Sequence, residues 1–373
     1  MKPHVIAFYL PQFYPFPEND EWWGKGFTEW TNVGKAKPMF RGHNQPRVPT
    51  ELGYYDLRLP IIREQQAELA KEAGVTAFCY WHYWFGNGRR LLADVFNEVL
   101  ASGKPNFPFC LGWANHSWMA KNWNADGTTK ERILIEQTYP GVEDAKMHFD
   151  FLLKAFKDKR YVKIDGMPLL YIFDAKHLPQ IYISLFKQWT IEAGFPGLLL
   201  VANCHENYRD KKEFITKGYD FVSYQRLSGK FLKKRYFRGQ VRLFRYWDKF
   251  KAFFTNNPPF LEDYNDAYPN FILESDKAND VIPAIIPQWD HSPRSGRNGV
   301  IMKNSNPQAF YKHVKIALNT IKDKPGNRQI LFLRSWNEWG EGNFMEPDIT
   351  YGRGFINALR KALDEYEHNN EIS

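Results

Sequence analysis

The sequence predicts an α/β protein with a (β/α)8 TIM barrel fold, in which long insertions follow some of the strands. Short runs rich in β-branched and aromatic residues alternate with helical patterns along the whole chain, which is typical of βα units around a parallel sheet. Eight such runs are present, and a length of 373 residues suits one barrel with extended loops. We therefore expect residues 1–373 to form a single catalytic domain.

The predicted elements follow one another in the order that a barrel requires. The strands span residues 4–10, 75–81, 108–114, 168–174, 198–204, 221–225, 282–289 and 329–336. The helices predicted between them include 60–73, 89–102, 143–158, 179–193 and 307–321. Gly74 and Gly103 follow two of these helices directly, where a left-handed residue often ends a helix. Cys79, Cys110 and Cys204 each lie inside a predicted strand, and we expect them to be reduced core residues.

An insertion rich in basic and aromatic residues is predicted at about 226–260. Between Arg226 and Lys251, ten lysines and arginines face a single acid, Asp248, in a chain whose formal net charge is +8. Such a segment could contact an anionic membrane surface through 226–254, or hold an acidic or lipid-linked glycan. A solvated helical excursion over one side of the barrel is the plainer alternative. Nucleic acid is not an expected partner, because no nucleic-acid-binding motif accompanies the charge.

Polar and aromatic residues gather at the carboxyl ends of the predicted strands. Catalytic residues of a (β/α)8 barrel lie at these ends, whereas a purely structural rim would carry aliphatic residues. The long first excursion, 13–59, contains "WWGKGFTEWTNV" and should fold over the same rim. The chain also has 13 tryptophans, whose flat rings can stack on sugar faces or pack at protein interfaces. The candidate substrate-binding residues are Tyr9, Gln12, Trp30, Trp81, His82, Tyr83, Trp113, Asn115, His116, Gln288, Trp289, Asp290, Trp336 and Asn337.

The stretch "RSWNEWGEGN" places two acids at the end of the last predicted strand. Glu338 comes first, Glu341 follows three residues later, and Gly342 lets the chain turn tightly. Cleavage of a glycosidic bond requires a proton donor for the leaving oxygen and a carboxylate that attacks, activates water or activates a substrate hydroxyl. Two glutamates in different environments can divide these tasks. Taken alone, the pair has a plain alternative as solvated acids on a loop.

Several motifs carry a resemblance to known families. The stretch "WNEWGEGNFMEP" (336–347) resembles the N-E-W-x-E-G-x-x-x-E signature of the endo-acting α-mannosidases of glycoside hydrolase family 99. The motifs "FYLPQF", "WWGKGFTEWTNV", "GYYDL", "YWHYWF", "WAN" and "QWDHSPR" resemble bacterial proteins described as WbsX-type glycosyltransferases, which occur among polysaccharide and lipopolysaccharide biosynthesis proteins. The resemblance covers roughly residues 3–360, because the motifs occur in order along nearly the whole chain.

The resemblance implies a (β/α)8 barrel, catalysis without a metal and distinct roles for the acids. Glu338 matches the base that deprotonates the 2-hydroxyl of the sugar, which then attacks C1 and gives net retention. Glu341 matches the acid that protonates the leaving oxygen and later activates water. Glu346 matches the last acid of the signature, as a structural residue or a contact to a distal sugar.

Two motifs depart from the family pattern and bear on the substrate. The usual W-A-N-E-N-W is replaced by "WANHSW", so that His116 and Ser117 stand where an acid and an amide are typical. In "QWDHSPR", His291 and Ser292 stand where asparagine and threonine are typical. The H-I-E-P-Y motif of the mannosidases is absent from the sequence, so α-mannan specificity is not expected.

The sequence therefore predicts a retaining, metal-independent glycoside hydrolase that acts on a bacterial polysaccharide or lipopolysaccharide-type glycan. A glycosyltransferase of polysaccharide biosynthesis and a glycan-binding protein without turnover remain open as alternatives. No metal or cofactor is expected, because no HExxH or comparable ligand spacing occurs. The first residues lack the features of a signal peptide, which predicts the cytoplasm or its membrane surface, or the periplasm if a leader has been removed.

Overall fold

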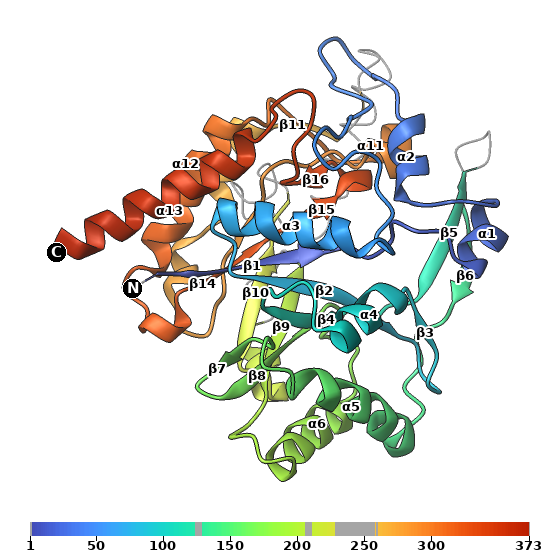
Figure 1. Ribbon diagram of the computed structural model, residues 1–373, viewed down its shortest axis with the longest axis vertical. Coiled ribbons are helices and arrows are strands. Elements are labelled where there is room, and N and C mark those ends of the chain that lie inside the picture. Colours follow the sequence, from blue (N-terminus) through green and yellow to red (C-terminus); the bar gives the residue numbers. More distant parts are fainter. Residues whose placement is uncertain (1, 124–128, 206–210, 228–257, 259, 373) are drawn as a thin grey trace.

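The computed structural model describes residues 2–123, 129–205, 211–227, 258 and 260–372. Within these residues, eight parallel strands lie side by side in the order β10, β9, β8, β4, β2, β1, β14 and β12 (Figure 1). Backbone hydrogen bonds between Val222 on β10 and residues just before β12 nearly close the sheet, at 2.9 Å from its N–H to Asp280 O and 2.8 Å from Ile282 N–H to its carbonyl. The predicted (β/α)8 barrel is confirmed.

Each of the eight predicted strands is present in the barrel. The barrel strands are β1 (His4–Tyr9), β2 (Ala77–Trp84), β4 (Phe109–Trp113), β8 (Met167–Ile172), β9 (Leu199–His205), β10 (Phe221–Gln225), β12 (Ala284–Ile285) and β14 (Ile330–Leu333). β12 is much shorter than the predicted 282–289 because Pro283 and Pro287 flank it and have no N–H to donate to a neighbour. The three cysteines are buried in β2, β4 and β9, as predicted.

Aromatic rings fill the barrel where the strands end. The Phe8 ring lies 4.8 Å from that of Tyr171, 5.2 Å from that of Phe332 and 4.7 Å from that of Trp81, centroid to centroid. All four side chains are largely buried. These four rings form an aromatic layer inside the barrel.

Helices surround the strands on the outside of the barrel (Figure 1). The helices around the barrel are α3 (Pro60–Ala73), α4 (Asp94–Ser102), α5 (Val142–Phe156), α6 (Gln180–Glu192), α7 (Lys211–Lys217), α12 (Pro307–Ile321) and α13 (Gly354–Ile372). The predicted helix 89–102 was wrong at its start, because Arg90 and Leu91 form strand β3, which pairs antiparallel with the end of β2.

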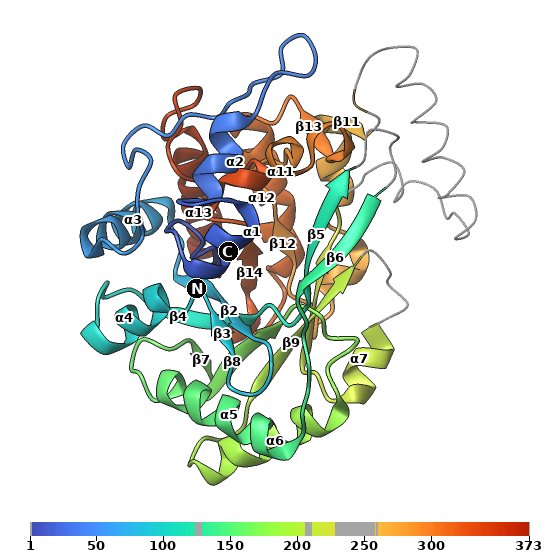
Figure 2. The same ribbon diagram turned by 90° about the vertical axis from the view of Figure 1, so that its right-hand side faces the viewer.

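Shorter elements make up the loops, many of them at the carboxyl ends of the strands. They are α1 (Pro17–Trp23), α2 (Glu29–Lys35), β3 (Arg90–Leu91), β5 (Trp118–Trp123), β6 (Thr129–Ile135), β7 (Lys163–Ile164), β11 (Leu261–Asp263), α10 (Tyr264–Ala267), η2 (Tyr268–Asn270), η3 (Glu274–Lys277), α11 (Ser292–Ser295), η4 (Gly296–Asn298), β13 (Ile301–Lys303), η5 (Gly326–Arg328), β15 (Asn337–Glu338), η6 (Trp339–Glu341) and β16 (Asn343–Phe344). Strands β5 and β6 form a hairpin that projects from the barrel (Figure 2).

Most of the predicted basic insertion, 228–257 and 259, lies outside the described residues, and with it most of the predicted membrane contact through 226–254. Arg226 itself is buried, and its guanidinium donates to both carboxylate oxygens of Asp276 at 2.5 and 2.8 Å. Its charge is therefore neutralised within the fold. Among the described helices, none combines the length and apolar character needed to cross a bilayer.

Candidate active site

A cavity of about 1080 Å³ lies at the carboxyl ends of the barrel strands. Its floor includes Phe8 and Trp81 from the aromatic layer, and the β5–β6 hairpin contributes Trp118 to its wall. Residues of α1 and α2, among them Trp23 and Glu29, also line it, which confirms that the excursion 13–59 folds over this rim. The size is at the upper end of the range for small-molecule sites and leaves room for more than one sugar ring.

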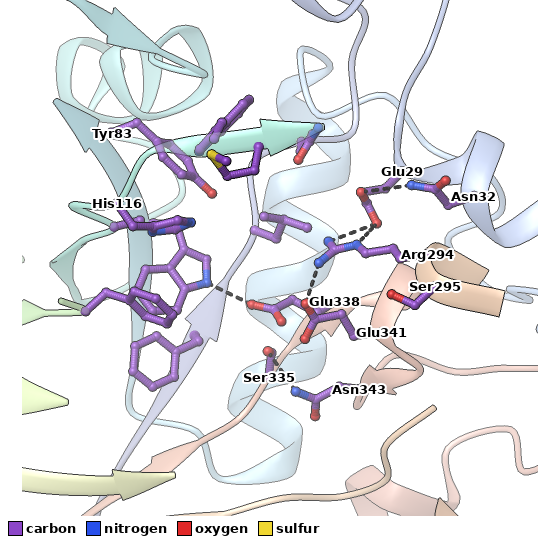
Figure 3. A pocket seen from close by; sticks show the side chains of 18 of the residues that line it. Glu29, Asn32, Tyr83, His116, Arg294, Ser295, Ser335, Glu338, Glu341 and Asn343 are labelled. Atoms are coloured by element: carbon purple, nitrogen blue, oxygen red, sulfur yellow. Dashed lines mark hydrogen bonds and ion pairs between the residues drawn. The ribbon is translucent and has the colours of Figure 1, made fainter. Parts of the chain in front are cut away.

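The structure brings part of the predicted site together in this cavity. Seven predicted residues line it: Gln12, Trp81, Tyr83, His116, Trp289, Glu338 and Glu341. Figure 3 shows Tyr83 and His116 across the cavity from Glu338 and Glu341. Residues from β1, β2, β4, β12 and β14, or from the segments after them, therefore meet at one place.

The other predicted residues do not line this cavity. They are Tyr9, Trp30, His82, Trp113, Asn115, Gln288, Asp290, Trp336, Asn337 and Glu346. Trp113 and Trp336 are fully buried at 0% exposure, and the His82 ring bonds to His148 at 2.9 Å. Side chains at strand ends alternate in direction, so adjacency in the sequence did not guarantee a place in the cavity.

Several of these residues instead hold the loops that carry the cavity. The Asn337 side chain accepts from the Leu10 N–H at 2.7 Å and donates to the Leu10 carbonyl at 3.0 Å, which ties the turn after β14 to β1. Asn115 makes the same kind of two-way contact with the backbone of Asp174, at 2.7 and 2.9 Å. Because Asn337 precedes Glu338 directly, its contacts help to fix the position of that carboxyl.

Two buried acids stabilise the surrounding loops. Glu346 accepts hydrogen bonds from the Trp339 indole at 2.6 Å, from Gln66 at 2.6 Å and from the Tyr55 hydroxyl at 2.8 Å. Burial raises the pKa of Glu346 to about 7 against these hydrogen bonds. Asp290 is held by three donors: His43 and Gln45, each at 2.7 Å, and the Ser292 N–H at 3.0 Å.

The turn after β14 presents Glu338 and Glu341 side by side (Figure 3). The turn ends at Gly342, whose φ of 55° lies in the left-handed region that favours glycine. The Trp81 indole donates to Glu338 Oε1 at 2.8 Å, and both carboxyl groups line the cavity.

Arg294 joins the pair to a third acid. Its guanidinium donates to Glu29 Oε2 at 3.0 and 3.1 Å and also to Glu341 Oε1 (Figure 3). The ring of His291 approaches the same Glu341 oxygen at 3.6 Å. A Cβ on Gly340 would lie 1.9 Å from Glu29 Oε2, so the glycine that directly precedes Glu341 makes room for this ion pair.

These contacts give the two acids opposite charge states. Burial, and then the negative charge of Glu341, raise the pKa of Glu338 to about 8. Burial also acts to raise the pKa of Glu341, but the charge of Arg294 and the neighbouring His291 ring outweigh it and lower the pKa to about 2. Near neutral pH the pair therefore carries one proton, held on Glu338. The roles implied by the family resemblance require the opposite in the first step, namely an ionised Glu338 as the base and a protonated Glu341 as the acid.

Sequence reasoning missed Glu29 and Arg294. Both stand in quoted motifs, "WWGKGFTEWTNV" and "QWDHSPR", but 265 residues separate them. The only signal was the position of these motifs in loops predicted at the rim. A further cation in the cavity, Arg334, directly follows β14 and was also missed.

The fold and the site define an enzyme-like barrel with a buried carboxyl pair in an aromatic cavity. The chain belongs to the family described as Glycosyltransferase WbsX, whose model matches residues 5–359. Membership of this family supports a carbohydrate-active enzyme.

Comparisons with individual proteins agree with this assignment. The chain is 31% identical over 376 residues to the "Uncharacterized protein WxcX" of Xanthomonas campestris pv. campestris. The match covers 96% of this chain and 49% of the relative, so the chain spans about half the length of the curated relatives it matches. Among solved structures, the GH99 endo-α-mannosidase of Bacteroides thetaiotaomicron has a TM-score of 0.60 at 14% identity, with 99% of each chain covered. A "Glycoside hydrolase-like protein" has a TM-score of 0.57 at 16% identity, covering 97% of this chain and 94% of the other. At these identities the likeness shows the fold.

Proposed function

We propose that this protein is a retaining glycoside hydrolase that cleaves a bacterial polysaccharide or lipopolysaccharide-type glycan with Glu338 and Glu341. The observation that carries the proposal is the geometry of this pair: two carboxyls that line an aromatic cavity, one bound by the Trp81 indole and the other by Arg294. A proton donor and a base side by side are what glycosidic bond cleavage requires. The two carboxyl groups supply the proton transfers, and the proposed reaction uses no metal.

The charge states favour an exchange of the roles that the resemblance implies. Glu338 would protonate the leaving oxygen, and ionised Glu341 would take the proton of the 2-hydroxyl of the sugar, so that O2 attacks C1. In the second half, ionised Glu338 would take a proton from water as that water opens the 1,2-anhydro ring, and Glu341 would return its proton to O2. In this substrate-assisted route the nucleophile is O2 of the sugar, so neither carboxyl has to reach C1.

The proposal is tested by incubating the protein with capsular polysaccharides and lipopolysaccharide glycans and measuring new reducing ends. We expect release by the wild type and a loss of about 10²-fold or more in Glu338→Gln and Glu341→Gln. Undiminished release by both variants would refute the catalytic pair.

The roles are separated with an aryl glycoside of the released sugar, whose leaving group needs no protonation. In the first turnover of this substrate Glu338→Gln should release the aryl alcohol at close to the wild-type rate, whereas Glu341→Gln should not. The opposite result would restore the roles that the resemblance implies.

A glycosyltransferase is the second candidate, favoured by the description of the family. In that case the cavity would hold a donor sugar and an acceptor, and the pair would assist transfer to the acceptor instead of to water. Consumption of a nucleotide sugar in the presence of a lipid-linked glycan, without release of reducing ends, would favour transfer. Tight glycan binding with neither reaction would indicate a binding protein without turnover.

A further inference from the structure

Arg334 lies at the floor of the cavity, one residue after β14. It lines the cavity, but it is only 4% exposed, so its guanidinium is held within the top of the barrel. One of its terminal nitrogens, Nη2, donates to the Tyr171 hydroxyl at 2.5 Å and to Asn203 Oδ1 at 2.9 Å. The guanidinium carbon lies 4.9 Å from the centroid of the Phe8 ring.

The charge of Arg334 is not neutralised by the part of the chain that the structure describes. No ion pair joins it to a carboxylate there, and its Nε has no hydrogen-bond partner. Both side-chain acceptors of its hydrogen bonds, a hydroxyl and an amide, are neutral. A buried cation without a counterion is costly, and buried charges are ordinarily paired.

The remaining surroundings leave this charge open to a ligand. Of the acids that line the cavity, Glu29 and Glu341 are bound by Arg294, and Glu338 accepts from a tryptophan indole. In the part of the chain that the structure describes, these contacts leave Arg334 without a carboxylate partner.

We infer that the cavity binds a sugar bearing a carboxylate, which pairs with Arg334. This inference rests on the proposed glycan substrate and names its class as a uronic acid. Phe8 lies against Arg334 and stacks on Trp81, whose indole in turn donates to Glu338 at 2.8 Å. The carboxylate thus binds at the same aromatic layer as the catalytic pair, within reach of the sugar that reacts or its neighbour.

Charge balance favours a carboxylate over a phosphate monoester. A carboxylate carries one negative charge and matches one arginine, whereas a phosphate monoester carries about −1.5 to −2 near pH 7. The extra charge would need a further cation, and because Arg294 is bound to Glu29 and Glu341, it would have to come from the exposed Lys35 on α2. Polar groups near the floor, Ser335 and Asn343, can hydrogen-bond hydroxyls of the ring (Figure 3).

The inference is tested by isothermal titration calorimetry at pH 7 with methyl glycosides of glucuronate, galacturonate and mannuronate. Each is compared with its neutral hexoside, and glucose 6-phosphate and galactose 6-phosphate serve as the phosphate arm. We expect at least one uronate to bind about tenfold tighter than its neutral counterpart, which is the size of one charge-assisted contact. In Arg334→Gln the ratio should fall to about one, and Arg334→Lys should keep part of it.

Arg353→Gln is the control, because it removes the same charge from an arginine that lies at the surface outside the cavity and is paired with Glu51 and Glu72. It should leave the preference unchanged, and thermal unfolding should show that each variant is folded. The inference is overturned if no uronate binds up to about 20 mM, a limit that corresponds to very weak affinity. It is also overturned if neutral sugars or the phosphates bind as well as the uronates, or if the preference survives Arg334→Gln. Binding needs no turnover, so a failed hydrolysis assay and a failed titration are separate results.

Discussion

Two arginines line the same cavity and differ in what surrounds them. Arg294 contacts Glu29 and Glu341, so its charge is neutralised inside the protein. Arg334 contacts neutral groups, the Tyr171 hydroxyl and the Asn203 amide oxygen. In the proposed reaction the first arginine favours the proton on Glu338, whereas the second is proposed to pair with a charged sugar. The cavity therefore has a half in which the cation is paired with protein carboxylates, here called the balanced half, and a half in which it is not, the unbalanced half.

The largest expected effect comes from breaking the balanced half. Arg294→Gln leaves Glu29 and Glu341 buried without a cation, which should lower the free energy of unfolding by about 3 kcal/mol. Glycan cleavage should fall by about 10²-fold, because the pKa of Glu341 rises and the pair loses its fixed proton distribution. Chemical denaturation and the reducing-end assay measure the two effects.

The control for Arg294 is Arg353, which bridges Glu51 and Glu72 at the surface with contacts of 2.5 to 2.7 Å. Arg353→Gln should cost less than about 1 kcal/mol, because exposed ion pairs contribute little. Equal losses in the two variants would contradict the view that burial gives the Arg294 cluster its importance.

The next effect concerns the proton on Glu338. Its folded pKa of about 8 lies above the usual 4.5, so its contribution to stability is complete below pH 4.5 and is lost as the pH rises through 8. Across this window the free energy of unfolding of the wild type should therefore fall by on the order of 2 kcal/mol relative to that of Glu338→Gln. This is less than the whole pKa difference implies, because water in the cavity screens the charge. Urea denaturation at several pH values measures the difference. Glu68 lies on the exposed face of α3, and the free energy of unfolding of Glu68→Gln should depend on pH as that of the wild type does. If Glu338→Gln also follows the wild-type pH dependence, the raised pKa of Glu338 is excluded.

The sequence predicted the barrel and identified Glu338 and Glu341 as catalytic candidates. It did not predict the contacts that determine which of these two acids is protonated. Strand ends in a parallel barrel meet at one rim, so order along the chain located Glu338, Trp81 and Trp289 correctly in the cavity. It could not tell which side chains face inward, and Trp113 instead packs in the core. Nor could it pair Glu29 with Arg294, because that contact depends on how two long loops cross.

A smaller effect is expected from the glycine that admits the Arg294 cluster. In Gly340→Ala, the new Cβ would lie 1.9 Å from Glu29 Oε2 and 3.0 Å from Arg294 Nε, so the ion pair must shift. We expect a loss of about 1 to 2 kcal/mol, typical of overpacking, and a reduced rate of glycan cleavage. Gly34→Ala is the matched control, because a Cβ there meets nothing within 4 Å and alanine favours helix α2. If Gly340→Ala is as active and stable as Gly34→Ala, the close approach of Glu29 is unimportant.

The smallest effect should come from the unbalanced half. Arg334→Gln removes hydrogen bonds to Tyr171 and Asn203 but also removes a buried charge without a counterion, and these changes oppose each other. The free energy of unfolding should therefore change by less than about 1 kcal/mol, against about 3 kcal/mol for Arg294→Gln. Chemical denaturation of both variants at pH 7 without ligand makes the comparison. A loss in Arg334→Gln as large as that in Arg294→Gln would mean that the protein itself depends on this charge, and the contrast between the two arginines would disappear.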